Sequence, residues 1–196
     1  MAKKYPIYLN LQNKNVLIVG AGTACLEKLQ GLNGTEAKIT IISREIKKEV
    51  QDWLLLHPEI KCEVRDVKEE DLQDRDVIFL ATNHSETNKS LKEKANALRI
   101  WANSVDDPSH CDFYTSSLID LGPVQFSIST DGKFAGLTAA LRRLFEEVIP
   151  ENEEDLFEKI FFMRKELKNK LPDEKERRKV LKEIISRLEN EYFRKP

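Results

Sequence analysis

The chain has 196 residues, of which 40% are hydrophobic, and this is enough apolar material to bury the core of a globular protein. Its 32 Lys and Arg residues are balanced by 34 Asp and Glu residues, and the formal charge of -2 excludes the basic overall surface of a nucleic-acid-binding protein. No segment approaches the roughly 20 consecutive apolar residues of a membrane helix, and the first residues lack the apolar core of a signal peptide, so we expect a cytoplasmic protein.

The first half of the chain alternates short β-branched runs with segments of helical periodicity. This pattern predicts an α/β fold in which helices cover a Rossmann-type parallel sheet. Strands are expected over residues 16–19, 39–42, 59–64, 76–81 and 100–105, and helices from the glycine turn to about residue 32, over 47–56 and over 86–98.

The pattern changes after Pro108. Residues 123–130 alternate apolar and polar side chains as an antiparallel strand does, and a helix is predicted over residues 137–148. Two further helices are indicated by apolar residues at helical spacing in the last part of the chain. We therefore expect a dinucleotide-binding domain over residues 1–113, a strand-and-helix region over 114–149 and a helical domain over 150–196.

The most informative motif is the glycine turn after the first expected strand, which contains Gly20 and Gly22. Gly20 permits a tight turn, and Gly22 lets a pyrophosphate approach the backbone at the positive end of the next helix. Cys25 occupies the third position, where Gly or Ala is usual, and its small side chain still allows close contact between helix and strand. The motif predicts a dinucleotide site.

The end of the second strand bears on which dinucleotide is bound. An acid about 20 residues after the glycines normally binds the ribose 2′-hydroxyl of NAD, but Ser43 and Arg44 stand there, followed by Glu45. An arginine could neutralise a 2′-phosphate, so these residues leave NADP open beside NAD. Ala81 and Thr82 end the fourth strand, at the edge where a Rossmann ligand crosses the sheet.

Several segments together resemble the precorrin-2 dehydrogenases of siroheme synthesis. They are Pro6-Ile-Tyr-Leu9, Asn15-Val-Leu-Ile-Val-Gly-Ala-Gly22, Asp76-Val-Ile-Phe-Leu-Ala-Thr-Asn83, Trp101-Ala-Asn-Ser-Val-Asp-Asp-Pro108 and Ser127-Ile-Ser-Thr-Asp-Gly-Lys133. The resemblance runs from Pro6 into the helical tail, and it implies a Rossmann domain, a dimerisation region, a helical domain and a homodimer. It also implies oxidation of precorrin-2 to sirohydrochlorin with NAD, an activity that some family members combine with insertion of ferrous iron.

The resemblance also implies roles for individual residues. The family's nucleotide contacts fall on Thr23, Ala24, Ser43 and Arg44, its functional aspartate falls on Asp106, and Asn103 belongs to the same motif as Asp106. Asp106 follows the fifth strand, where it could receive a proton from the substrate if partial burial favours its neutral form. It could instead only orient the substrate while solvent takes the proton.

The tetrapyrrole carries many carboxylates, so its pocket needs cationic or hydroxyl donors. Lys133, Arg142 and Arg143 lie near the turn into the helix over 137–148, and Thr130 keeps a hydroxyl of the family motif. The alternative for the three cations is a solvated helix face.

Metal chemistry is expected to be transient. Cys25, Cys62 and Cys111 have no CxxC spacing, which argues against a closed zinc site and favours reduced thiols. His110 is a candidate for brief contact with iron, but no permanent metal is expected, because adjacent residues such as His110, Cys111 and Asp112 rarely point to one centre.

Two other functions remain open. One is a non-catalytic sensor or carrier that binds a nucleotide or a tetrapyrrole, which the departure at Phe134 and Ala135 from the family's Ser-Pro could indicate. The other is a chelatase that no longer uses the cofactor. Reduction of NAD on addition of precorrin-2 distinguishes both from the dehydrogenase.

Overall fold

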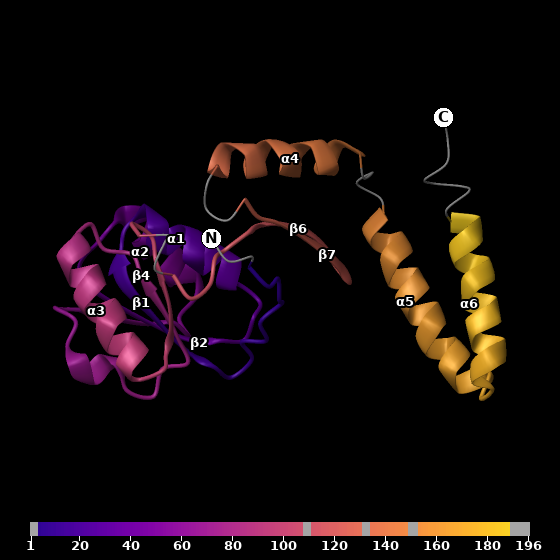
Figure 1. The fold of residues 1–196 in the computed structure, drawn as a ribbon, viewed down its shortest axis with the longest axis horizontal. Coiled ribbons are helices and arrows are strands. Elements are labelled where there is room, and N and C mark those ends of the chain that lie inside the picture. The colour runs from indigo at the N-terminus through magenta and orange to yellow at the C-terminus, as the bar shows by residue number, and fades with distance from the viewer. Residues whose placement is uncertain (1–3, 108–110, 131–133, 149–152, 189–196) are drawn as a thin grey trace. The chain divides into compact units, whose positions relative to one another are not determined.

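The computed structural model describes residues 4–107, 111–130, 134–148 and 153–188, and the chain forms two compact units, Met1–Thr115 and Ser116–Pro196 (Figure 1). The first unit is a Rossmann-type α/β domain, which confirms the predicted fold class. Its strands are β1 (Asn15–Ala21), β2 (Lys38–Ile46), β3 (Lys61–Val64), β4 (Val77–Leu80) and β5 (Trp101–Ser104). Its helices are α1 (Thr23–Leu32), α2 (Lys48–Leu56) and α3 (Ser85–Ala97), and a 3₁₀ turn, η1 (Glu69–Leu72), lies between β3 and β4.

All five strands are parallel, in the order β3-β2-β1-β4-β5. The chain builds the sheet outward from β1 to β3 and then returns to place β4 on the other side of β1. This reversal between β1 and β4 is a topological switch point, and ligands of open α/β sheets bind there, at the carboxyl ends of the strands.

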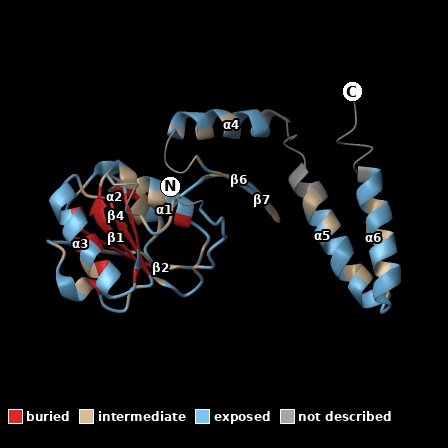
Figure 2. Ribbon diagram, viewed as in Figure 1, coloured by how far each residue is buried: buried red, intermediate tan, exposed pale blue. Residues whose placement is uncertain are grey.

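The sheet is buried on both faces, as Figure 2 shows by the red strands at the centre of the unit. In β1, Val16 and Ile18 pack on the face covered by α1 and α2, whereas Leu17 and Val19 pack on the face covered by α3. All four side chains are almost fully inaccessible. Burial on both sides explains why this strand is a continuous apolar run and not an alternating one.

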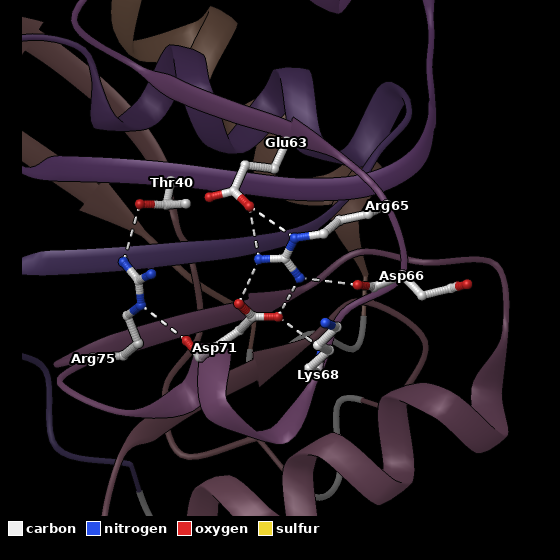
Figure 3. A network of polar contacts seen from close by, with 7 residues as sticks. All are labelled: Thr40, Glu63, Arg65, Asp66, Lys68, Asp71 and Arg75. Carbon is white, nitrogen blue, oxygen red and sulfur yellow. Dashed lines mark hydrogen bonds and ion pairs between the residues drawn. The ribbon is translucent and has the colours of Figure 1, made fainter.

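A polar network fixes the crossover from β3 to β4 (Figure 3). Arg65 binds both carboxylate oxygens of Asp71 at 2.6 Å and donates from Nε to Glu63 at 2.8 Å. Asp71 also accepts the backbone N–H of Lys68 at 2.7 Å, and its own backbone carbonyl accepts from Arg75 at 3.0 Å. The guanidinium of Arg65 holds the pKa of Asp71 below its usual value. The network anchors the segment that returns the chain to the switch point.

The second unit begins with a hairpin of β6 (Ser117–Leu121) and β7 (Val124–Ile128), whose strands pair antiparallel. Strand β6 was not expected from the sequence. Gly122, at φ +68, belongs to the two-residue connection between the strands. The helices of this unit are α4 (Ala135–Val148), α5 (Glu153–Lys170) and α6 (Glu174–Leu188).

Two features of the helices complete the fold. The Oδ1 atom of Asp173 accepts the backbone N–H groups of Lys175 and Glu176, at 2.7 and 2.9 Å, and so caps the start of α6. None of the described helices is long and apolar enough to cross a membrane.

Candidate dinucleotide site

The glycine turn joins β1 to α1 at the switch point. Gly20 has φ +104, and a Cβ atom built there would lie 2.4 Å from the carbonyl oxygen of Ala81. The backbone of β1 therefore passes so close to the end of β4 that this position requires a glycine. The Ala81 N–H donates to the carbonyl of Val19 at 2.8 Å, which completes the contact between the two strand ends.

The start of α1 is open to an anionic ligand. No side chain caps this helix at Gly22, and a Cβ atom built on Gly22 would meet nothing within 4 Å. The first amides of α1, including those of Thr23 and Ala24, can therefore face a diphosphate, which the positive end of the helix favours. Behind them, Cys25 is fully buried, and burial raises the pKa of its thiol to about 12. These residues fit the diphosphate of a dinucleotide.

The end of β2 contains a bulge beside this turn. Val19 pairs with Ile42 and Ala21 pairs with Ile46, so Gly20 alone in β1 stands opposite residues 43–45 in β2. The Ser43 hydroxyl donates to the carbonyl of Glu45 at 2.7 Å.

The side chain of Arg44, which lies in this bulge, contacts two other residues. Its guanidinium contacts Nε2 of His84, and its Nε lies 3.6 Å from Oδ1 of Asp66. Because β1 lies between β2 and β4, the contact with His84 spans the carboxyl end of β1.

The end of β4 is held by a side-chain pair. The Thr82 hydroxyl donates to Oδ1 of Asn88 at 2.6 Å, and Nδ2 of Asn88 donates back to the Thr82 carbonyl at 3.0 Å. Asn88 is buried in α3, so the turn after β4 has a fixed position relative to that helix. Thr82 is thereby placed at the edge of the switch point, where the sequence predicts it.

The end of β5 carries the predicted functional aspartate. The Ser104 hydroxyl donates to Oδ1 of Asp106 at 2.5 Å, and the side chain of Asp106 is exposed in the described chain. The partial burial on which the proton-acceptor role depends is thus not supplied by the first unit. Asn103, whose contact with the cofactor stays a prediction, is buried and donates from Nδ2 to the carbonyl of Phe113 at 2.9 Å. Its amide donor is used to hold the loop that follows β5.

The thiol of Cys111 closes that loop. It accepts the Ser104 N–H at 3.2 Å and lies at hydrogen-bonding distance from the carbonyls of Ser104 and Asp107, at 3.2 and 3.3 Å. Burial raises the pKa of the Cys111 thiol, which favours the neutral form that can donate.

Asp112 makes a separate set of contacts. It accepts from Lys92, which is buried in α3, at 2.8 Å and from the backbone N–H of Ala102 at 2.8 Å. Cys111 and Asp112 therefore have different partners and do not converge on one centre. Among the described residues, no group of three or more His, Cys, Asp or Glu residues could hold a metal ion. His110 lies outside the described residues, and its transient contact with iron stays a prediction.

Two lysines of the first unit were not identified from the sequence. Lys47 donates from Nζ to the Thr23 hydroxyl at 3.1 Å, and its backbone N–H donates to the Ala21 carbonyl at 3.0 Å. Lys28 donates to the Thr115 hydroxyl at 2.8 Å, and burial lowers the pKa of its ammonium group. Both contacts join residues far apart in sequence, so no local pattern indicates them.

The predicted substrate residues belong to the second unit. The Thr130 hydroxyl accepts the backbone N–H of Phe134 at 3.2 Å, just before α4. Arg142 is exposed on α4, with its Nε 3.6 Å from Glu146, and Arg143 is exposed next to it. Lys133 lies outside the described residues.

Residues 7–117, more than half of the chain, match the model of a family described as NAD(P)-binding. The chain belongs to this NAD(P)-binding family. The match covers the sheet, the glycine turn and the loop after β5, so it includes every site residue of the first unit.

Curated relatives are siroheme synthases. The chain is 32% identical to siroheme synthase of Nitrosomonas europaea over 74% of its own length and 30% of the relative. It is 31% identical to that of Psychrobacter cryohalolentis over 92% of its length and 34% of the relative. The chain thus spans about a third of the length of the curated relatives that it matches.

A solved structure extends the likeness in fold to almost the whole chain. SirC, a precorrin-2 dehydrogenase, superimposes with a TM-score of 0.80 at 24% sequence identity, covering 93% of this chain and 89% of SirC. The second unit therefore belongs to the shared fold together with the first.

Proposed function

We propose that this protein catalyses the NAD-dependent oxidation of precorrin-2 to sirohydrochlorin in siroheme biosynthesis. The observation that carries the proposal is the open, uncapped start of α1 at the switch point. Only the end of β4 separates the end of β1 from the end of β5, whose following loop bears Asp106. The siroheme synthase relatives and the fold shared with SirC support precorrin-2 as the substrate.

The protein groups divide into binding and proton-handling roles. NAD, when bound, supplies the hydride acceptor. The amides of Thr23 and Ala24 would hold its diphosphate, Ser43 and Arg44 lie where the adenosine half would sit, and Ala81 and Thr82 border its path across the sheet. Gly20 and Gly22 keep the backbone close to that path.

Asp106 would handle the proton that leaves the substrate as the hydride is transferred. In the described chain its carboxylate is exposed and oriented by the Ser104 hydroxyl. The substrate must therefore contribute the cover that excludes water, or Asp106 acts by orienting the substrate while solvent accepts the proton. Thr130, Lys133 and Arg142 are proposed to bind the substrate carboxylates.

The test is anaerobic reduction of NAD on addition of precorrin-2, followed by absorbance of NADH. The wild type should form NADH, Asp106→Asn should lose at least tenfold in rate while still binding NAD, and Asp107→Asn should serve as the adjacent control with little change. A wild type that binds NAD but forms no NADH would overturn the proposal in favour of a sensor, a carrier or a chelatase. Full activity of Asp106→Asn would refute the role of Asp106.

A homodimer built through the second unit is part of the proposal. Helix α4 packs on the β6–β7 hairpin, where the rings of Phe126 and Phe145 stack at 6.2 Å. Phe126 and Leu144 nevertheless remain 38% and 54% exposed, which favours a partner surface over this region. Light scattering after gel filtration should give a dimer for the wild type and a monomer for Phe126→Glu. A monomeric wild type would refute this part.

We place the protein in the cytoplasm, where its three free cysteines would stay reduced. Insertion of ferrous iron is retained as a prediction of the sequence. It is checked by adding ferrous iron and sirohydrochlorin to the protein and following the formation of siroheme by its absorbance.

A further inference from the structure

We propose that the first unit contains a second binding site, which takes a small organic cation: an ammonium or guanidinium group on a short apolar stem. The site is a cavity of about 240 Å³ lined by the last turns of α1 and α2 and by the loops that follow them. It lies at the amino ends of β2 and β3, the edge of the sheet opposite the glycine turn. The cavity plays no part in the proposed function.

Much of the lining of this cavity is apolar. Leu29, Leu32 and Ile39 are buried, and Trp53, which is partly buried, packs against the same core. Binding sites for small molecules are mostly apolar cavities with a few polar groups, and those for drug-sized ligands measure about 300–1,000 Å³. A cavity of this size therefore suits a smaller molecule with an apolar body.

The polar groups of the cavity favour a positive charge. Glu36 and Glu59 line it, and none of the described residues that line it is a lysine or an arginine. The Glu36 carboxylate accepts from the neutral amide of Gln12 at 2.6 Å, and the Glu59 carboxylate lies 3.2 Å from Nδ1 of His57. Among the residues that the structure describes, neither carboxylate pairs with a lysine or an arginine, so both charges remain available to a cation.

The two helices add to this preference. Both α1 and α2 end at the cavity, and the C-terminal end of a helix carries a partial negative charge that favours cations. Neither of these two helices, which the structure describes in full, has a basic residue in its last turn to offset that charge. The helix ends and the carboxylates therefore act in the same direction.

The aromatic side chains of the cavity also suit a cation. Trp53 and His57 both line it, and their rings stack at a centroid distance of 4.5 Å. The indole ring is the best aromatic partner of an ammonium or guanidinium group. In the described part of the chain, Nε1 of Trp53 is the one buried side-chain nitrogen or oxygen atom without a hydrogen-bond partner. Buried polar groups are normally paired, so the protein alone does not satisfy the surroundings of Trp53.

The test follows the indole N–H signal of Trp53 by NMR in the isotope-labelled full chain. Trp101 in β5 does not line the cavity, and its signal is the internal reference. Three probes of similar shape are titrated: phenethylamine is cationic at neutral pH, phenethyl alcohol is neutral and phenylacetate is anionic. The amine should shift the Trp53 signal saturably, with a dissociation constant at least tenfold below that of the alcohol, and phenylacetate should leave the signal unchanged.

Two variants test the carboxylates. Glu59→Gln should weaken binding of the amine at least threefold and leave binding of the alcohol unchanged, because it removes the charge of an exposed side chain and keeps its shape. Glu49→Gln is the matched control. It removes one negative charge from the exposed start of α2, whereas the cavity lies at the end of that helix, and it should change neither affinity.

Four results would contradict the proposal. Equal affinities for the amine and the alcohol would show that the cavity selects an apolar body and not a charge. Tighter binding of phenylacetate would show that it takes an anion. An affinity for the amine that Glu59→Gln does not change would refute recognition of the charge by this carboxylate. A Trp53 signal that none of the probes moves would show that no ligand of this class enters.

Discussion

Replacement of Gly20 by alanine should separate β1 from β4 at the switch point. The residue has φ +104, a conformation that costs an L-residue about 1–2 kcal/mol. The added Cβ atom would also lie 2.4 Å from the Ala81 carbonyl oxygen and 2.7 Å from its carbonyl carbon. Both are backbone atoms of the sheet, so relief requires movement of the chain, at about 1–3 kcal/mol. We expect Gly20→Ala to lower the free energy of unfolding by about 2–5 kcal/mol.

Gly34→Ala is the matched control. Gly34 also has a positive φ, at +75, but a Cβ atom there would meet nothing within 4 Å. Gly34→Ala should therefore lower the free energy of unfolding only by the cost of the positive φ. The effect of alanine on the unfolded chain is the same for both variants. Urea denaturation followed by circular dichroism measures the difference, and NAD titration should show lost binding in Gly20→Ala alone. Equal stability of the two variants would refute the argument from close approach.

Three further predictions concern the same unit. Gly22→Ala should change the free energy of unfolding by less than about 0.5 kcal/mol, because the added Cβ atom meets no neighbour. The same Cβ atom would enter the space at the start of α1 where the diphosphate is expected, so calorimetry should show NAD binding weakened at least tenfold. Lys92→Met should cost about 2 kcal/mol in urea denaturation, since it leaves the Asp112 carboxylate without its buried cation. Asp71→Asn should reduce the loss of stability in acid. Because its pKa is lowered in the folded state, the Asp71 carboxylate stabilises the fold at pH values above the ordinary pKa of 3.8. This contribution is lost as the pH falls through the folded-state pKa. The melting temperatures of the wild type and of Asp71→Asn should therefore converge below that range.

The sequence was sufficient to predict the α/β architecture because its signals are local. The apolar run ending at Gly20 and the glycine turn determine a strand, a turn and a helix within 18 residues of chain. The hairpin strand Ser117–Leu121 was missed, although Gly122 before Pro123 marks a two-residue turn and could have indicated it. Short exposed strands show little alternation of apolar and polar residues, so only the residues of the adjoining turn indicate them.

The contacts that position the site were not predictable in the same way. The Lys47–Thr23 and Lys28–Thr115 bonds join elements that meet only after the sheet has formed. The bond from the Asn103 amide to the Phe113 carbonyl depends on the path of the loop, and the contact of Asn103 with the cofactor stays a prediction. The sequence therefore predicted at which strand ends the site residues lie, whereas the partners of each side chain depend on tertiary structure.

The bulge in β2 has a consequence for how such a protein can diversify. Pairing between β1 and β2 is interrupted at residues 43–45 and resumes at Ala21 and Ile46 with a shift of register, while Ser43 still pairs with Val64 of β3. Arg44 and Glu45 pair with neither β1 nor β3, so their exchange should alter the proposed cofactor site without changing the register of the sheet. Within this one strand, the residues that align the sheet thus end at Ser43, where the proposed cofactor contacts begin.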